Sequence, residues 1–161
     1  MAAASIGWWL IPALVVVGLV ALVLAWRPLR GILHEIQAER ARELFALQRE
    51  WLEAKFIDMA AASGKPRGLR WKDCEWESPV KFARERKTGQ LTALVGVAVA
   101  FEAVAGSDME GLPSVGNLRN ATAIFFFHRG QWHTTGRALF NMNPDEALDR
   151  FKAQYEPVEM G

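Results

Sequence analysis

The stretch QLTALVGVAVAFEAV, residues 90–104, alternates large apolar residues with smaller ones and holds a single charged residue, Glu102. One set of alternate positions holds Leu91, Ala93, Val95, Val97, Val99 and Phe101, and the other holds Thr92, Leu94, Gly96, Ala98, Ala100 and Glu102. A period of two predicts a β-strand whose successive side chains point to opposite faces. Because the set of smaller residues is also mostly apolar, we expect both faces of this strand to be partly covered.

Shorter strand-like segments lie on both sides of this stretch. Residues 69–76 and 80–86 are two short strands separated by Ser78-Pro79. Residues 121–128 and 131–140 form a hairpin around Arg129-Gly130. Between them, residues 105–118 carry three glycines and a proline, which predicts a loop long enough to be a lid or a partner contact. The pattern predicts a curved antiparallel sheet of four to five strands.

The C-terminal segment has the features of a short helix. Asn143 is a good N-cap, Pro144 fits the first helical position, and Glu146 completes a capping box. The apolar residues that follow at helical spacing are Ala147, Leu148, Phe151 and Tyr155. We therefore expect one final helix with a single buried stripe that includes Tyr155.

A long amphipathic helix is predicted over residues 32–62, which contain neither proline nor glycine. Its apolar residues form two adjoining stripes, the first with Leu33, Ile36, Leu44, Leu47 and Trp51 and the second with Phe45, Leu52, Phe56 and Met59. We expect the C-terminal half of this helix to pack on the domain. A coiled coil is the alternative, but Gln37, Arg40 and Gln48 interrupt a heptad seam. The helix is expected to end near residues 63–66.

The N-terminal segment predicts a transmembrane helix. Residues 2–26 contain no charged residue or histidine, and residues 6–26 are apolar apart from Gly7, Pro12 and Gly18. At about 1.5 Å per residue this run spans the ~30 Å hydrocarbon core of a bilayer. Trp8 and Trp9 at one end and Trp26 at the other are predicted to lie at the two membrane interfaces. A cleaved signal peptide is the alternative, but no Lys or Arg precedes the apolar run.

Positive charge after the span predicts its orientation. Arg27, Arg30, Arg40 and Arg42 follow the apolar run and none precedes it, which favours a cytoplasmic C-terminal domain. The single cysteine, Cys74, fits a reducing compartment. Three parts are predicted: a membrane anchor over residues 1–27, a juxtamembrane amphipathic helix over residues 28–66, and a small α+β domain over residues 67–161.

The order of these elements, with the hairpin Phe127-His128-Arg129-Gly130-Gln131-Trp132 before the last strand, resembles the cystatin-like and nuclear transport factor-like superfamily of cone-shaped sheets. The resemblance covers roughly 100 residues and consists of element order and one hairpin. It implies a long helix laid across a curved sheet. Domains of this kind include enzymes, ligand pockets and scaffolds, and none of their catalytic residues can be placed on this chain.

Few residues here suit chemistry. Cys74 lies between Asp73 and Glu75, which raise the pKa of a thiol, so we interpret it as a structural residue. His128 and His133 flank the hairpin turn, can approach one another, and with Glu75 or Asp73 would form a metal or acid–base site, but solvent-facing histidines are the simpler interpretation. The indoles predicted to form core or pocket walls are those of Trp51, Trp71, Trp76 and Trp132. The sequence predicts no catalytic residue, metal site or cofactor.

We therefore predict a single-pass membrane protein whose domain is a non-catalytic interaction or assembly module. Its expected partners are the lipid bilayer and either another subunit of a membrane complex or further copies of itself. A net charge of +1 without a basic cluster gives no reason to expect nucleic acid. The first alternative is a tethered pocket for a small, lipid-like ligand, lined by the four tryptophans and both histidines. An enzyme using His128 or His133 is a weaker alternative.

Overall fold

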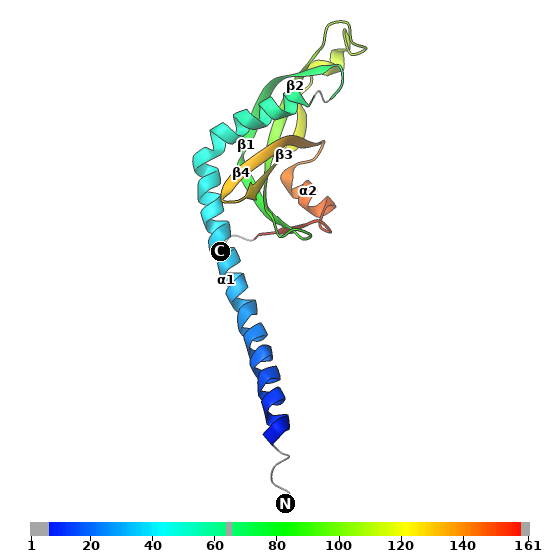
Figure 1. Cartoon of the computed structure of the whole chain (residues 1–161). Coiled ribbons are helices and arrows are strands. Elements are labelled where there is room, and N and C mark those ends of the chain that lie inside the picture. The colour runs from blue at the N-terminus through cyan, green and yellow to red at the C-terminus, as the bar shows by residue number, and fades with distance from the viewer. Residues whose placement is uncertain (1–6, 64–65, 159–161) are drawn as a thin grey trace, which may run out of the picture. The chain divides into compact units, whose positions relative to one another are not determined.

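The computed structural model describes the backbone of residues 7–63 and 66–158 and the side chains of residues 11–22, 35–63 and 66–158. The chain divides into two units, Met1–Arg40 and Ala41–Gly161. The second unit is an α+β domain with a curled antiparallel sheet, which confirms the predicted class (Figure 1). The elements are α1 (Gly7–Ala62), β1 (Leu69–Glu85), β2 (Leu91–Ala103), the 3-10 helix η1 (Pro113–Gly116), β3 (Arg119–His128), β4 (Gln131–Phe140), α2 (Pro144–Arg150) and β5 (Tyr155–Pro157).

The sheet has the strand order β4-β3-β2-β1-β5, so β2 lies at its centre. On one face Ala93 of β2 lies between Phe82 and Phe125. On the other face a second apolar cluster forms from Ala83, Leu94, Ile124, Leu148 and Tyr155, with Leu139 and Phe151 packed against it. Both faces of the central strand are therefore covered, as its alternating pattern predicts.

Helix α1 packs on the first face of the sheet with the part that begins at Ala41. Phe45 makes edge contacts with Phe82 and Phe125, at ring-centroid distances of 5.9 and 5.4 Å. In the second predicted apolar stripe Phe45, Leu52 and Phe56 are buried and Met59 is exposed, whereas Leu47 and Trp51 of the first stripe are exposed. Successive residues of a helix are about 100° apart, so Trp51 and Leu52 cannot both face the sheet. The backbone is helical through positions 28 and 31, so the helix does not begin at residue 32 as predicted.

Strand β1 is one element of 17 residues and not the two short strands predicted. Its register on β2 shifts between Trp76 and Val80, where β1 contains two extra residues. This bulge accommodates Pro79, which has no N–H for a regular ladder. The side chain of Glu77 lies over Gly96 of β2, where a β-carbon would come within 2.1 Å of Glu77 Oε2. A glycine at position 96 therefore leaves the space that the bulge occupies.

The C-terminal segment confirms the predicted capping box and corrects the length of its helix. The side chain of Asn143 accepts from Glu146 N, and the side chain of Glu146 accepts from Asn143 N. Helix α2 ends at Arg150, so Tyr155 is not part of its stripe. Tyr155 instead begins β5 and pairs with Glu85, because the end of β1 offers an edge for backbone hydrogen bonds.

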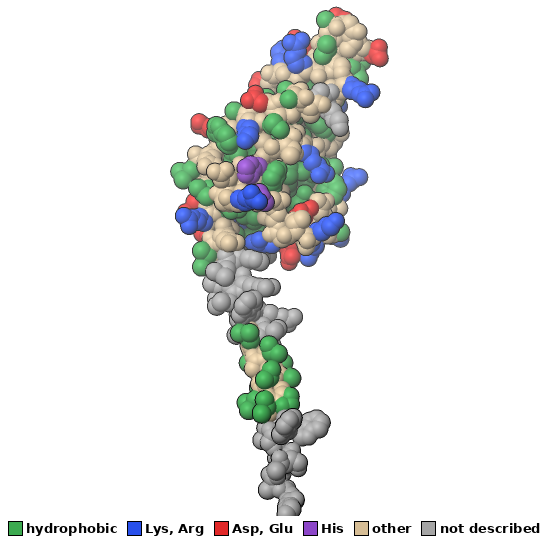
Figure 2. Space-filling view, viewed as in Figure 1, with side chains coloured by type: hydrophobic (Ala, Val, Ile, Leu, Met, Phe, Trp, Pro, Cys, Tyr) green, Lys and Arg blue, Asp and Glu red, His purple; other side chains and the backbone are tan. Residues whose placement is uncertain are grey.

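In the first unit, the described side chains of residues 11–22 are all exposed and apolar or glycine, and they form the green band of Figure 2. Among the residues described, no helix is long and apolar enough to cross a membrane. The span predicted over residues 1–27 is not supported by this finding and stays a prediction. The predicted interface side chains, those of Trp8, Trp9, Trp26, Arg27 and Arg30, lie outside the described residues.

Candidate functional site

Two of the predicted pocket tryptophans are part of an aromatic cluster between α1 and the sheet. Trp71 packs against Phe56 and Phe101, at ring-centroid distances of 6.0 and 5.3 Å. Trp76 packs against Phe56 and Phe125, at 5.5 and 6.2 Å. These edge and tilted arrangements are those that aromatic quadrupoles favour. The two indoles are partly buried and therefore pack between α1 and the sheet.

Trp132 is buried at the start of β4, with 2% of its surface exposed. Its ring packs on Phe45 with the centroids 5.0 Å apart, and its Nε1–H donates to the carbonyl oxygen of Ala41 at 2.7 Å. The pairing satisfies the polar atom of a buried indole, which is costly to leave without a partner. This contact fixes the beginning of β4 against α1 and so positions the surface next to it.

A cleft of about 310 Å³ lies between α1 and β4, lined by Gln48, Trp51, Lys55, Gln131, Trp132 and His133. It brings together three residues of the predicted site, one from α1 and two from β4. Trp51 leaves 57% of its surface exposed, and the Lys55 ammonium lies over its ring at 4.7 Å from the centroid. The cleft thus combines a flat apolar surface, two amides and positive charge, and none of its lining residues is acidic.

The two hairpin histidines lie close together at the edge of this region. Their ring centroids are 6.5 Å apart, and His133 also stacks on Phe126 at 5.7 Å. Figure 2 shows histidine side chains, in purple, on the drawn surface next to Lys and Arg side chains, in blue. Among the side chains that the structure describes, those of residues 11–22, 35–63 and 66–158, no group of three His, Cys, Asp or Glu is arranged to hold a metal ion. The approach of the two rings is a feature that an acid–base reaction could use.

Cys74 is half-buried in β1, and its pKa is raised to about 11. Burial is the larger cause and the carboxylate of Asp73 the smaller, since both disfavour the thiolate. A thiol in this state is a weak nucleophile at neutral pH. The structure therefore agrees with the interpretation of Cys74 as a structural residue.

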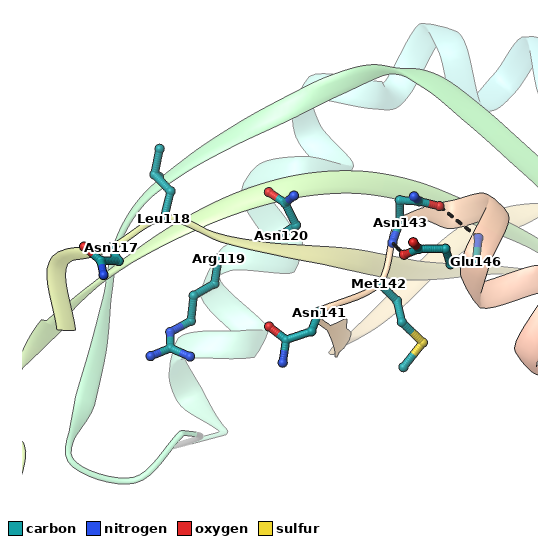
Figure 3. A pocket seen from close by; sticks show the side chains of 8 residues that line it. All are labelled: Asn117, Leu118, Arg119, Asn120, Asn141, Met142, Asn143 and Glu146. Atoms are coloured by element: carbon teal, nitrogen blue, oxygen red, sulfur yellow. Dashed lines mark hydrogen bonds between the residues drawn. The ribbon is translucent and has the colours of Figure 1, made fainter. Parts of the chain in front are cut away.

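Sequence reasoning missed a second pocket, of about 560 Å³, between the start of β3 and the connection from β4 to α2 (Figure 3). It is lined by Asn117, Leu118, Arg119, Asn120, Asn141, Met142, Asn143 and Glu146. Arg119, Asn141 and Met142 point to the same side in Figure 3, while Asn143 and Glu146 are engaged in the capping box. The four asparagines were the available signal, but they form two pairs, at 117 and 120 and at 141 and 143, that lie far apart in the sequence and that only the fold joins.

The backbone of Asn141 has a positive φ of 58° and donates its N–H to the carbonyl oxygen of Asn120 at 2.8 Å. Asparagine tolerates this left-handed conformation better than most residues. The bond ties together the two segments that line the second pocket. With Asn143 and Glu146 already paired, the groups left to meet a ligand there are three amides and one guanidinium, all on exposed residues.

No family model matches this chain, and the comparisons with curated proteins and with solved structures found no match.

Proposed function

We propose that this chain is a membrane-anchored interaction module whose α+β domain binds a partner polypeptide. The observation that carries the proposal is the exposure of two large apolar side chains on α1. Leu47 leaves 82% of its surface exposed and Trp51 leaves 57% exposed, although Phe45, Leu52 and Phe56 of the same helix are fully buried. Burying such side chains stabilises a complex, and exposed tryptophans are enriched among residues that dominate binding energies.

The interior of the domain argues for an interaction surface more than for an enclosed ligand chamber. Trp71, Trp76 and Trp132 all make close ring contacts with phenylalanines. Trp132 is therefore buried and Trp71 and Trp76 are partly buried in the fold, whereas Trp51 leaves 57% of its surface exposed. The cystatin-like arrangement that the element order predicts is part of this proposal, because domains of that superfamily include scaffolds that bind other proteins.

The anchor is the second part of the proposal. Residues 2–26 contain no charged side chain, and the described stretch from Ile11 to Leu22 is helical and apolar on every side. A helix that is apolar all round has no polar face for water and is typical of a membrane span or a protein core. With the arginines that follow residue 26, we place the domain on the cytoplasmic side.

Native mass spectrometry tests this function on the full-length chain, extracted from its own membranes in a mild detergent. We expect a discrete complex of fixed stoichiometry with another polypeptide or with further copies of the chain. The interaction module would be refuted if the extracted chain is monomeric and carries no partner when its concentration in the detergent matches that in the membrane. Alkaline carbonate extraction tests the anchor, since release of the chain into the soluble fraction would refute it.

A small-ligand site is the second candidate, because three predicted pocket residues, Trp51, Trp132 and His133, line one cleft. At about 310 Å³ the cleft is at the lower end of the range for small-molecule sites. Such a ligand would appear in the same spectra as a reproducible added mass on a single chain. Its loss in a Trp51→Ala variant would assign it to this cleft, and retention would exclude the cleft.

A further inference from the structure

The two edges of the sheet differ in how they are closed. At one edge β5 pairs with β1 only over Ala83–Glu85. Farther along β1, the guanidinium of Arg49 donates to the carbonyl oxygens of Ser78, at 2.7 Å, and of Glu77. The bulge and Pro79 further interrupt this edge, which are devices that prevent another strand from pairing. In the described residues no strand lies beyond β4, so β4 is the edge left for pairing.

The backbone of β4 is oriented for such pairing near the hairpin turn. Arg129 and Gly130 both have positive φ, 50° and 81°, and His128 pairs with Gln131 across this two-residue turn. In a two-residue hairpin the pair next to the turn exchanges hydrogen bonds, and hydrogen-bonded and free pairs then alternate along the strand. The N–H and C=O groups of Trp132 and Thr134 therefore point away from β3.

The cleft described above lies alongside these groups. Gln48, Trp51 and Lys55 of α1 border it on one side and residues 131–133 of β4 on the other. A strand added to β4 would run through this space and bury part of the exposed indole of Trp51. The irregularity between the pairs Phe125–Thr134 and Ala123–Ala138 limits regular pairing to residues 131–134. The contact is therefore short and depends on the side chains beside it.

We propose that the edge of β4 binds an extended segment of a partner polypeptide in which apolar and acidic residues alternate. This inference rests on the proposed interaction module and names the site and the chemistry of its partner. Side chains of an added strand alternate between the two faces of the sheet. On the α1 face they meet Trp51, which favours an apolar residue. On the other face they meet Gln131 and His133, with His128 close by.

Charge complementarity favours acidic residues at the positions of the added strand that face Gln131 and His133. The ionisable side chains that line the cleft are those of Lys55 and His133, and His128 lies next to His133. No carboxylate lines the cleft, so an acidic segment meets only cationic or neutral partners. Opposite charges on neighbouring strands stabilise pairing and like charges oppose it. A basic segment of the same apolar pattern is therefore expected to bind more weakly.

A displayed library of random nine-residue peptides, selected against the full-length chain in detergent, tests the proposal. We expect the enriched sequences to alternate apolar residues with Asp or Glu. Replacing Glu by Lys in an enriched peptide should weaken binding at least about tenfold, and so should Trp51→Ala in the protein. Leu118→Ala, which removes an exposed apolar side chain just before β3, is the matched control and should leave the affinity unchanged.

N-methylation of the selected peptide tests strand addition itself. An added strand uses the N–H groups of alternate residues only, so methylating one alternate set should abolish binding and methylating the other set should be tolerated. Equal effects of the two sets, enrichment of neutral or basic sequences, no enrichment at all, or full binding by the Trp51→Ala variant would each overturn the proposal. Enrichment of sequences like residues 108–112 of this chain would assign the edge to a second copy and overturn the separate partner.

The two proposals fail in distinguishable ways. If the native complex persists in the Trp51→Ala variant, the interaction module stands and the β4 site is wrong. If no complex forms in the wild-type chain, the interaction module is wrong whatever the peptides do.

Discussion

Gly136 of β4 is the position where the smallest substitution is expected to have a large effect on stability. Its φ is +70°, and a β-carbon built on it would come within 2.3 Å of Ala60 N and 2.6 Å of Met59 C on α1. A left-handed backbone is less favourable for alanine at 136 than for glycine by about 1 kcal/mol. The added β-carbon also displaces the backbone of α1, which costs about 1–3 kcal/mol more. We expect Gly136→Ala to lower the free energy of unfolding by about 3 kcal/mol, out of a typical 5–15 kcal/mol.

Thermal unfolding of the full-length chain in detergent measures this effect, followed by the near-ultraviolet circular dichroism of the aromatic cluster. For a domain of this size the loss corresponds to a drop in Tm of about 10 °C. Gly89→Ala is the matched control, because Gly89 has a φ of +72° and no atom within 4 Å of the added β-carbon. The control should show only the backbone cost, about 1 kcal/mol. Equal losses in the two variants would refute the close contact between β4 and α1.

Three further predictions concern single side chains. The guanidinium of Arg49 donates to two carbonyl oxygens of the β1 bulge, which a lysine cannot do with one ammonium in the same geometry. Arg49→Lys should therefore lower the free energy of unfolding in urea by about 1–2 kcal/mol. An unchanged midpoint would argue against that contact. Trp71→Ala should cost about 2 kcal/mol by the same measurement, because Trp71 is partly buried, while the exposed Trp51→Ala should cost less than about 1 kcal/mol; similar costs would contradict their different burial. With a pKa of about 11 against 9.0 for a free thiol, Cys74 should react with iodoacetamide at pH 8 roughly 100-fold more slowly in the folded than in the unfolded chain. Because folding raises this pKa, its contribution to stability is complete below pH 9.0 and is lost as the pH rises to about 11; a fast reaction at pH 8 would contradict the burial of Cys74.

The candidate site was predictable only in part. Trp51, Trp132 and His133 belonged to the predicted set and do border one cleft. Trp71 and Trp76 belonged to the same set and lie, partly buried, in the aromatic cluster between α1 and the sheet. Residue type could not separate the two groups, because a tryptophan suits a core and a pocket wall equally well. The asparagine-lined pocket was not predicted because its two lining segments meet only through the pairing of β3 with β4.

By itself the sequence determined the secondary structure wherever the signal was local. The alternation of residues 90–104, the Arg129-Gly130 turn and the Asn143 capping box each act over a few residues, and each appears in the structure as predicted. Tertiary structure decided what depends on distant partners: the union of the predicted pair of strands into β1, the transfer of Tyr155 from a helix to β5, and the choice of which helical stripe is buried. A local pattern sets the backbone conformation and the period of side chains, but only long-range packing selects the face that meets the sheet, and that selection leaves Leu47 and Trp51 exposed.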